Sequence, residues 1–166
     1  MRIVKTGLIA LAASFAAGTA AHAVEVKKEA EAPGTPESVW ALVGDFCAIK
    51  DWHPAVVECE QVDEGGDTFR ILTLGDGGKI KEKLTDKDDT SYSYEIIESP
   101  LPVKNYSAKL DIDEDDEDNV VEIEWEAEFD PADGVEEDKA IEVITGIFAD
   151  GLAGIQKKAK EADKAQ

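Results

Sequence analysis

The chain has 166 residues, of which 38 are Asp or Glu and 17 are Lys or Arg, giving a formal net charge of -21. A domain of this length can bury about two thirds of its unfolded surface, so a packed core is possible. The acidity excludes nucleic acid and anionic membrane surfaces as partners, because the chain has no basic stripe to displace their counterions. The hydrophobic share of 43%, with three Trp and five Phe, argues against disorder.

The first 23 residues are typical of a secretory signal peptide. They begin with two basic residues, continue with an apolar run over 7–17, and end in Ala21-His22-Ala23, an A-x-A cleavage site. The apolar run is shorter than the roughly 20 residues that a membrane-spanning helix needs. We therefore predict a periplasmic or secreted protein, without membrane insertion, whose single mature domain covers residues 24–166.

Two cysteines, Cys47 and Cys59, would enter an oxidising compartment on export, where a pair forms a disulfide if its geometry allows. The alternative is two buried thiols that pack as small hydrophobic side chains. The spacing permits the bridge but does not decide between the two. One histidine remains after removal of the signal peptide and there is no CxxC, so we predict neither a metal site nor a cofactor.

The predicted elements begin with a strand and two short helices. Val24–Ala32 alternates apolar and charged residues, as a strand does. Thr35 precedes Pro36 and a series of apolar residues at helical spacing, which predicts a helix with Thr35 as its N-cap. A second short helical turn passes through Ile49 and ends before Pro54.

From residue 54 to 130 the apolar period changes from 3.6 to 2, which predicts six further strands. Short turns rich in Gly, Asp and Pro separate them, so neighbouring strands should pair antiparallel. The predicted strands are Val56–Val62, Thr68–Leu74, Lys79–Thr85, Ser91–Glu98, Asn105–Asp113 and Val120–Phe129.

The last predicted element is a long helix from Val135 to about Ala162. Its first turn is acidic and its last turns are basic, which suits the helix dipole. One long amphipathic helix must then cover the apolar face of a seven-stranded sheet, and a curved sheet around one helix leaves a cavity. The helix has an apolar stripe formed by Ile141, Ile144, Phe148, Gly151, Leu152 and Ile155.

This order of elements, together with several short motifs, resembles the SRPBCC superfamily of START, Bet v 1 and polyketide cyclase/dehydrase-like proteins. The resemblance covers about residues 24–160. The motifs are Pro36-x-x-Val39-Trp40-x-x-Val43-x-Asp45-Phe46, Trp52-His53-Pro54, the Arg70 strand, Gly78-x-Ile80-x-Glu82-x-Leu84, Tyr92-x-Tyr94, Pro102-x-x-Asn105-Tyr106 and Trp125-x-x-x-Phe129.

The resemblance implies an α+β helix-grip fold, in which a seven-stranded curved antiparallel sheet wraps around the long C-terminal helix, with two short helices after the first strand. The chain is also similar to small exported bacterial polyketide cyclase/dehydrase-like proteins, among them a periplasmic accessory protein of methanol oxidation.

Part of the pattern is shared with the plant abscisic acid receptors, and this resemblance implies roles for several residues. Glu82 takes the place of an inward carboxylate that contacts the ligand through water. The Gly75–Gly78 turn is shorter than the gate loop of those receptors and lacks its Leu-Pro element, which argues against a gate-and-latch mechanism. The implied lining positions are Tyr94, Ile96, Tyr106 and Ala108, and the implied loop at the pocket mouth is Leu101-Pro102-Val103.

Glu82 also stands out within its own strand, because its carboxylate shares a face with apolar residues. If that face points inward, the charge needs a partner. Arg70 shares its strand face with Leu72 and Leu74 and can supply one. A structural Glu–Arg pair and a carboxylate that polarises a ligand both fit this pattern.

His53 is the one group of the mature chain expected to titrate near neutral pH. A hydrogen-bonding role in a tight loop is favoured over catalysis, because no Ser or Cys nucleophile is spaced to use it. We assign no catalytic residue. The predicted ligand-binding residues are Trp52, His53, Arg70, Leu72, Leu74, Glu82, Tyr94, Ile96, Leu101, Pro102, Tyr106, Ala108, Phe148 and Leu152.

The acidic run Asp111–Glu122 places carboxylates at positions 1, 3, 5 and 12, as an EF-hand loop does. Position 6, however, is Asp116 instead of Gly, and the flanking segments are predicted strands. The better interpretation is a solvated hairpin tip, with loose cation binding as the alternative.

These features predict a periplasmic protein that binds a small apolar or amphipathic molecule between the sheet and the long helix. Two alternatives stay open. One is an accessory protein that docks a periplasmic partner, such as an alcohol-oxidation system, through its acidic surface; the other is a cyclase/dehydrase-like enzyme. A pocket of a few hundred Å³ would favour binding, and a closed core would favour docking.

Overall fold

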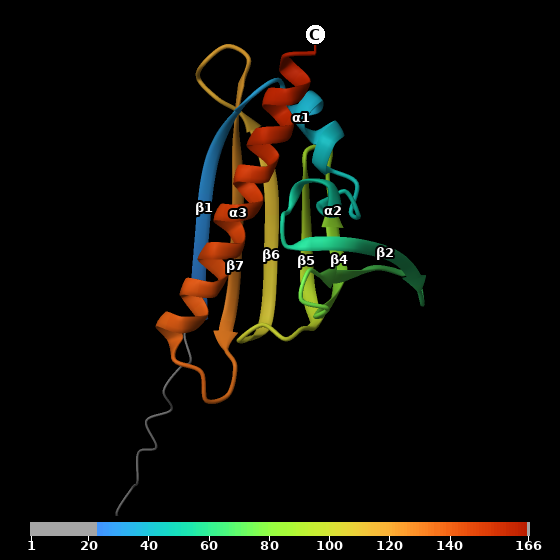
Figure 1. Cartoon of the computed structure of the whole chain (residues 1–166), viewed down its shortest axis with the longest axis vertical. Helices are drawn as coiled ribbons and strands as arrows, with labels where there is room; N and C mark the ends of the chain where they lie inside the picture. Colours follow the sequence, from blue (N-terminus) through green and yellow to red (C-terminus); the bar gives the residue numbers. More distant parts are fainter. Residues whose placement is uncertain (1–22, 166) are drawn as a thin grey trace, which may run out of the picture.

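A computed structural model describes residues 23–165 and confirms the helix-grip fold (Figure 1). Residues 1–22 of the predicted signal peptide lie outside the described residues. The elements in chain order are β1 (Val24–Pro33), α1 (Pro36–Val43), α2 (Ile49–Trp52), β2 (Val56–Glu64), β3 (Asp67–Leu74), β4 (Lys79–Lys87), β5 (Ser91–Glu98), β6 (Val103–Glu114), β7 (Val120–Pro131) and α3 (Glu137–Asp163).

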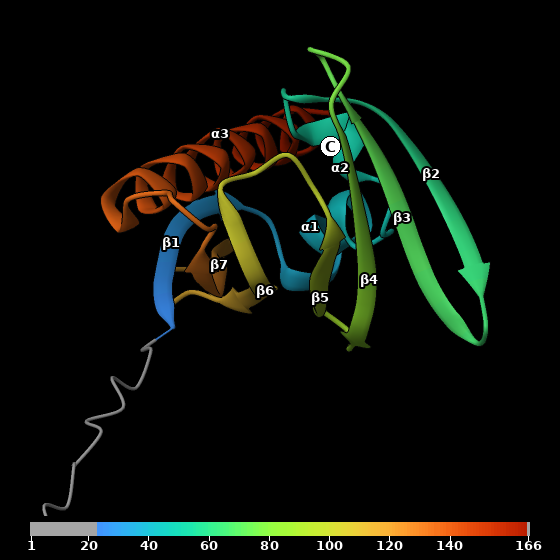
Figure 2. The same cartoon turned by 90° about the horizontal axis from the view of Figure 1, so that it is seen from below.

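The seven strands form one antiparallel sheet in the order β1-β7-β6-β5-β4-β3-β2. Strands β2 to β7 follow one another as a meander, and β1 pairs with β7 at the far end, with Val24 opposite Phe129. The sheet is curved, and α3 lies along its concave side with α1 and α2 beside it (Figures 1 and 2). A single layer of sheet and one long helix therefore enclose the core.

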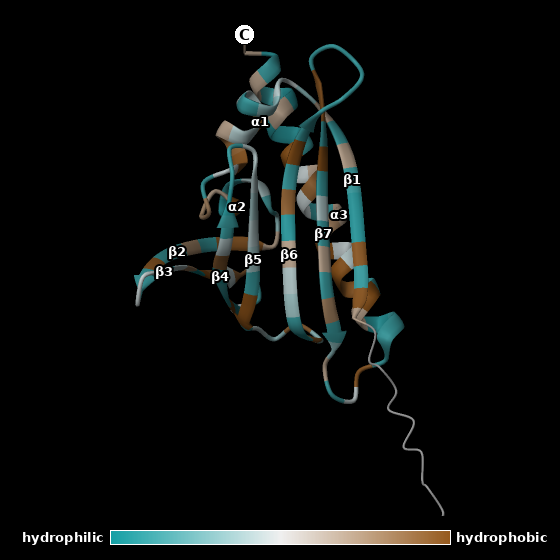
Figure 3. Ribbon diagram, turned by 180° about the vertical axis from the view of Figure 1, so that it is seen from behind, coloured by the Kyte–Doolittle hydropathy of each residue, from teal (hydrophilic) through white to brown (hydrophobic). Residues whose placement is uncertain are grey.

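The alternation of buried and more exposed residues along β7 shows which face of the sheet points toward the core. Val121, Ile123, Trp125, Ala127 and Phe129 are each at most 2% exposed. The residues between them are the outward-facing glutamates Glu122, Glu124, Glu126 and Glu128, as predicted. Figure 3 shows the resulting mixture of hydrophilic and hydrophobic positions along β6 and β7 from the outer side. The acidic charge of these strands thus lies on the outer face.

Helix α1 begins as its sequence predicts. The Thr35 side chain accepts a hydrogen bond from the Ser38 amide, the Ser38 hydroxyl accepts one from the Thr35 amide, and Pro36 is the first helical residue. Helix α3 starts two residues later than predicted, because Glu136 takes an extended N-cap conformation. Its buried stripe is Ala140, Ile144, Phe148, Gly151, Leu152, Ile155 and Ala159, whereas Ile141 is half-buried.

Helix α3 and the α2 segment approach each other at two glycines. A Cβ atom on Gly154 would lie 1.7 Å from the Trp52 carbonyl oxygen, and one on Gly151 would lie 2.8 Å from the His53 ring and 3.1 Å from the Trp52 ring. The missing side chains let the α2 backbone contact the helix directly. This contact holds His53, which follows α2, against α3.

No helix within residues 23–165 has the length and apolar character needed to cross a membrane.

The substitution Gly154→Ala should destabilise the protein by about 2 kcal/mol or more, because the added methyl group overlaps the Trp52 carbonyl. Gly146→Ala is the matched control. It lies on the same helix with nothing within 4 Å of the added Cβ, so it should stabilise the fold by up to about 1 kcal/mol. Urea unfolding followed by circular dichroism measures both, and equal effects would contradict the close contact of α2 with α3.

Candidate ligand-binding cavity

An apolar cavity of about 220 Å³ lies between the sheet and α3. Its walls come from the α2 segment, from strands β2 to β7 and from α3, so no one element forms it alone. The lining residues are Ile49, His53, Ala55, Val56, Leu72, Leu74, Ile80, Glu82, Tyr94, Ile96, Leu101, Tyr106, Trp125, Ile144 and Ile147.

Eight of the residues proposed from the sequence line this cavity, namely His53, Leu72, Leu74, Glu82, Tyr94, Ile96, Leu101 and Tyr106. Six do not, namely Trp52, Arg70, Pro102, Ala108, Phe148 and Leu152. Trp52 and Phe148 pack on the Trp125 ring, with ring centroids 5.6 and 4.4 Å away. Arg70 lies behind Glu82, and Ala108 sits within the sheet between Tyr94 and Ala127. Trp52, Phe148, Arg70 and Ala108 therefore contact lining residues without lining the cavity themselves.

Seven lining residues were not proposed from the sequence. Ile80 shares the inward face of β4 with Glu82, and Trp125 and Ile144 belong to buried periodic patterns, so periodicity offered a signal for these three. The other four are Ile49, Ala55, Val56 and Ile147. Their contact with the cavity depends on the path of the α2–β2 segment and on how α3 is rotated against the sheet, which no local pattern encodes.

One end of the cavity is bounded by two loops. Leu74 lies at the end of β3, Leu101 lies in the loop between β5 and β6, and both are half-buried. A Cβ atom on Gly78 would be 3.5 Å from both Leu74 and Pro100, so the β3–β4 turn meets the β5–β6 loop here. The predicted mouth loop thus borders the cavity through Leu101.

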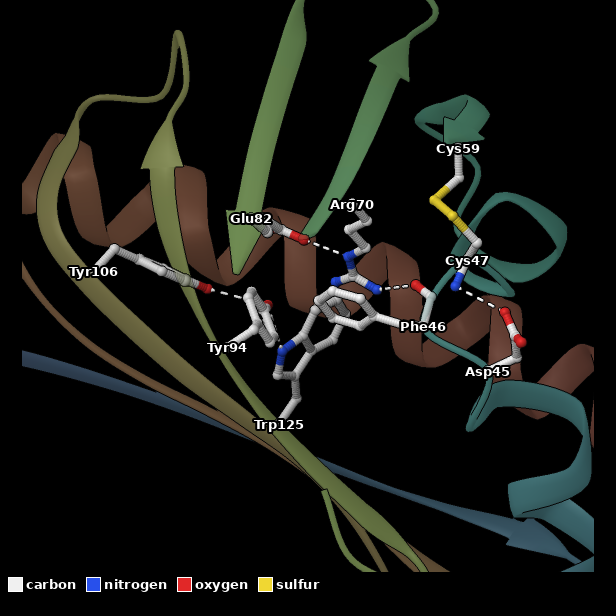
Figure 4. A network of polar contacts seen from close by, with 9 residues as sticks. All are labelled: Asp45, Phe46, Cys47, Cys59, Arg70, Glu82, Tyr94, Tyr106 and Trp125. Carbon is white, nitrogen blue, oxygen red and sulfur yellow. Dashed lines mark hydrogen bonds and ion pairs between the residues drawn. A yellow bond between two sulfur atoms is a disulfide. The ribbon is translucent and has the colours of Figure 1, made fainter. Parts of the chain in front are cut away.

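The polar wall of the cavity is built on a buried ion pair (Figure 4). Arg70 and Glu82 lie directly opposite each other in the β3–β4 register, and Arg70 Nε donates to Glu82 Oε2 at 2.5 Å. Arg70 Nη1 donates to the Phe46 carbonyl oxygen at 2.6 Å, and the Phe46 ring lies 4.1 Å from the guanidinium carbon. Arg70 is 0% exposed and Glu82 is 4% exposed. The guanidinium is therefore held by a carboxylate, a carbonyl and an aromatic face.

Burial raises the pKa of the Glu82 carboxyl above its usual value, and the neighbouring Arg70 charge opposes this effect. An arginine keeps its proton in proteins, so Arg70 presents a positive charge to Glu82, and their short hydrogen bond favours the ionised carboxylate. The hydrogen bond to Arg70 uses Oε2, while the Glu82 side chain also lines the cavity. The carboxylate is thus placed to accept a further hydrogen bond from a ligand.

Two tyrosine hydroxyls extend this polar wall. Trp125 Nε1 donates to the Tyr94 hydroxyl at 3.1 Å, and the hydroxyls of Tyr94 and Tyr106 are 3.5 Å apart. Burial raises the pKa of both tyrosines, so both remain protonated at neutral pH. The cavity therefore offers one acceptor carboxylate and two hydroxyls on a wall that is otherwise apolar.

His53 has both ring nitrogens engaged. The arrangement fits the tautomer in which Nε2–H donates to the Ile147 carbonyl oxygen at 3.0 Å and Nδ1 accepts from the Ala55 amide at 3.2 Å. Desolvation lowers the pKa of His53, although the hydrogen bond to Ile147 opposes this. His53 thus joins the start of β2 to α3 and has no ring nitrogen left for a ligand.

The two cysteines form a disulfide, with 5.5 Å between the Cα atoms of Cys47 and Cys59. It links the segment after α1 to β2, and Cys47 directly follows Phe46, whose carbonyl binds Arg70. The Cys47 amide also donates to Asp45 Oδ1 at 2.9 Å (Figure 4). The segment that holds Arg70 is therefore covalently anchored.

The carboxylates that lie close enough to share a metal ion are remote from the cavity. Within residues 23–165 they are Glu29, Glu122 and Glu124 on the outer face of β1 and β7, where Lys27 forms ion pairs with two of them. The Asp111–Glu122 run is a β-hairpin in which Asp113 lies opposite Glu122, so its carboxylates are spread along two strands. Neither arrangement contributes to the cavity.

A model of the family described as polyketide cyclase / dehydrase and lipid transport matches residues 23–160. The chain belongs to this family. No curated protein sequence matches it. The polyketide cyclase/dehydrase and lipid transport fold lies within the START/SRPBCC superfamily, as the motifs predict, and commonly encloses hydrophobic ligands. An apolar cavity between sheet and helix agrees with that property.

Several solved structures resemble this chain over most of its length. XoxI from Bacillus cereus is 33% identical over 84% of this chain and 97% of its own, with a TM-score of 0.77. An uncharacterised protein from Bacillus thuringiensis is 34% identical over 81% and 98%, with a TM-score of 0.76. The Zhui aromatase/cyclase from Streptomyces sp. R1128, at 16% identity over 84% and 94% and a TM-score of 0.70, shares the fold alone.

Glu82→Leu should reduce the free energy of unfolding by about 3–5 kcal/mol, because it leaves the buried Arg70 charge unpaired. The double variant Arg70→Met with Glu82→Leu removes both charges and should recover most of this loss. Urea unfolding of the three proteins measures the difference. A single variant as stable as the parent protein would contradict a buried ionic pair.

Because the folded protein binds a proton at His53 less readily than the unfolded chain does, its free energy of unfolding should decrease as pH falls below about 6.5. Above that pH the His53 contribution is constant. His53→Gln cannot titrate, so the difference between the two proteins isolates this group from the carboxylates. Urea unfolding at a series of pH values measures it, and a difference that does not change with pH would refute the assignment.

Proposed function

We propose that this protein binds a small apolar molecule with one polar group and holds it in the cavity between the sheet and α3. The observation that carries this proposal is the apolar cavity of about 220 Å³ with Glu82 on its wall. A cavity of about 150 Å³ takes benzene, and drug-sized ligands occupy about 300–1,000 Å³. The part of the ligand inside the cavity is therefore about the size of a substituted aromatic ring.

The polar residues of the cavity wall determine which polar group of a ligand they can bind. The Glu82 carboxylate, paired with Arg70, is a hydrogen-bond acceptor on the cavity wall, and Tyr94 and Tyr106 present hydroxyls close by. A ligand hydroxyl or amine can donate to the carboxylate, whereas a ligand carboxylate would be repelled by it. The preferred ligand thus carries a hydrogen-bond donor at one end of an apolar body.

Binding is better supported than catalysis. His53 has both ring nitrogens engaged, and Glu82 is held by Arg70. A proton-transfer mechanism would need a base that is free to move a proton, and these two groups are already committed to structural contacts. An unfilled cavity also favours a ligand-binding protein over one that only docks a partner.

The proposed location is the periplasm or the extracellular space. The predicted signal peptide supports export, and the Cys47–Cys59 disulfide is of the kind that persists in oxidising compartments.

The cavity can be tested with three ligands that share one ring, namely p-cresol, toluene and p-toluate. Calorimetric titration should rank p-cresol above toluene and p-toluate last, because only p-cresol donates to Glu82 and p-toluate is repelled. Ile147→Phe adds bulk to a lining residue and should weaken p-cresol binding at least about tenfold.

Ile141→Phe is the matched control, since Ile141 is a half-buried residue of the same helix that does not line the cavity. It should leave the affinity for p-cresol unchanged. Unaltered p-cresol binding by Ile147→Phe, or no binding of any of the three ligands to the parent protein, would overturn the proposal.

A further inference from the structure

Strands β5 and β6 are paired over only part of their length. Their register joins Ser91–Glu95 to Ser107–Asp111 and ends there. Beyond that point Ile96 and Glu98 pair with β4, while Val103 and Lys104 pair with β7. The sheet is therefore split between β5 and β6, toward the loop that joins them at the end of the sheet away from α1 (Figure 1).

A bulge in β6 accounts for the split. Asn105 has a left-handed backbone with φ of 51°, and the β6–β7 register shifts between Lys104 and Ser107. Asparagine tolerates this conformation better than most residues, and the Asn105 amide donates to Asp130 Oδ2 at 2.7 Å. Because a bulge bends its strand, the first part of β6 follows β7 and leaves β5 unpaired.

A groove lies at this split on the outer side of the sheet, and both strands and their connecting loop line it. Ile96 and Tyr106 line this groove and also line the inner cavity. The two spaces thus lie on either side of one layer of residues, at a place where no β5–β6 pairing joins the strands.

We propose that the split is a lateral opening of the cavity, and that the ligand is an elongated amphiphile with its apolar end in the cavity and its polar end in the outer groove. This inference rests on the proposed function and extends it to the length and the head group of the ligand.

The charges around the groove favour a cationic polar end. Glu95 and Glu98 are exposed on the groove, and neither has an ion-pair partner among the described residues. The lysines opposite them on β4, Lys83 and Lys81, form ion pairs with Asp67 and Glu64. The cation of the groove itself, Lys104, pairs with Asp133. A cationic head group would therefore meet two carboxylates that have no ion-pair partner, whereas an anionic head group would meet like charge.

The cavity volume limits how many carbons of the ligand's apolar chain can fit if the cavity has no opening. If about 150 Å³ accommodates the six carbons of benzene, a cavity of about 220 Å³ accommodates about nine carbons. A dodecyl chain exceeds this, so a dodecyl amphiphile can occupy the cavity only if its last carbons and its head group lie outside it, and the split offers them a path to the outer groove.

The decisive probes are dodecyltrimethylammonium and dodecyl sulfate, titrated calorimetrically far below micelle formation, with p-cresol as the short ligand. We expect dodecyltrimethylammonium to bind at least about tenfold more tightly than dodecyl sulfate and to lose affinity in Ile147→Phe. If p-cresol binds and neither dodecyl probe does, the cavity is closed and the lateral opening is refuted while the proposed function stands. If dodecyltrimethylammonium binds Ile147→Phe as well as the parent protein, it does not use the cavity, and the inference is also refuted.

A double variant that reverses two charges of the groove tests where the head group binds. Glu95→Lys with Glu98→Lys should weaken dodecyltrimethylammonium binding at least about tenfold and strengthen dodecyl sulfate binding. Glu58→Lys with Glu60→Lys is the matched control, because it makes the same change of net charge at exposed positions of β2 away from the groove. Equal effects of the two double variants would show that only long-range charge matters and would overturn the assignment of the groove.

Discussion

A positive charge without access to water imposes the main constraint on this fold. The Arg70 guanidinium can stay in the core only if a carboxylate, a carbonyl oxygen and aromatic rings surround it, and these come from separate parts of the chain. Glu82 reaches it only in the observed β3–β4 register, since a slip of one residue would move the carboxylate to the outer face. Phe46 reaches it because the segment after α1 is tied to β2 by the disulfide. The strand register and the position of the short helices are therefore set together.

The same ion pair gives the cavity its chemistry. Arg70 takes one side of the Glu82 carboxylate and leaves a polar edge on an otherwise apolar wall, beside the hydroxyls of Tyr94 and Tyr106. His53 and two glycines hold the α2 segment against α3, and both segments contribute residues to the cavity wall. The cavity is thus a consequence of structural contacts made behind its lining.

Periodicity was sufficient to predict the seven strands, the three helices and the face that Glu82 shares with apolar residues, because alternation and helical spacing follow the burial of each face. It was not sufficient for the lining of the cavity. Phe148 and Leu152 belong to the buried stripe of α3 as predicted, yet the cavity contacts Ile144 and Ile147, because the rotation and tilt of the helix over the sheet are set by tertiary contacts. The β5–β6 split depends on the left-handed backbone of Asn105, which the alternation of β6 does not reveal.

The pairing of β1 with β7 has a consequence for the order of folding. Val24 lies opposite Phe129, so the first strand to be synthesised has no partner until nearly the whole sheet has been made. Contacts between such distant parts of a chain form slowly, since a long loop must close first. The disulfide, in contrast, joins cysteines only 12 positions apart and needs no distant segment. The central part of the chain can therefore fold before its two ends pair. Until β1 pairs with β7, the edge of β7 remains available to strands of other molecules.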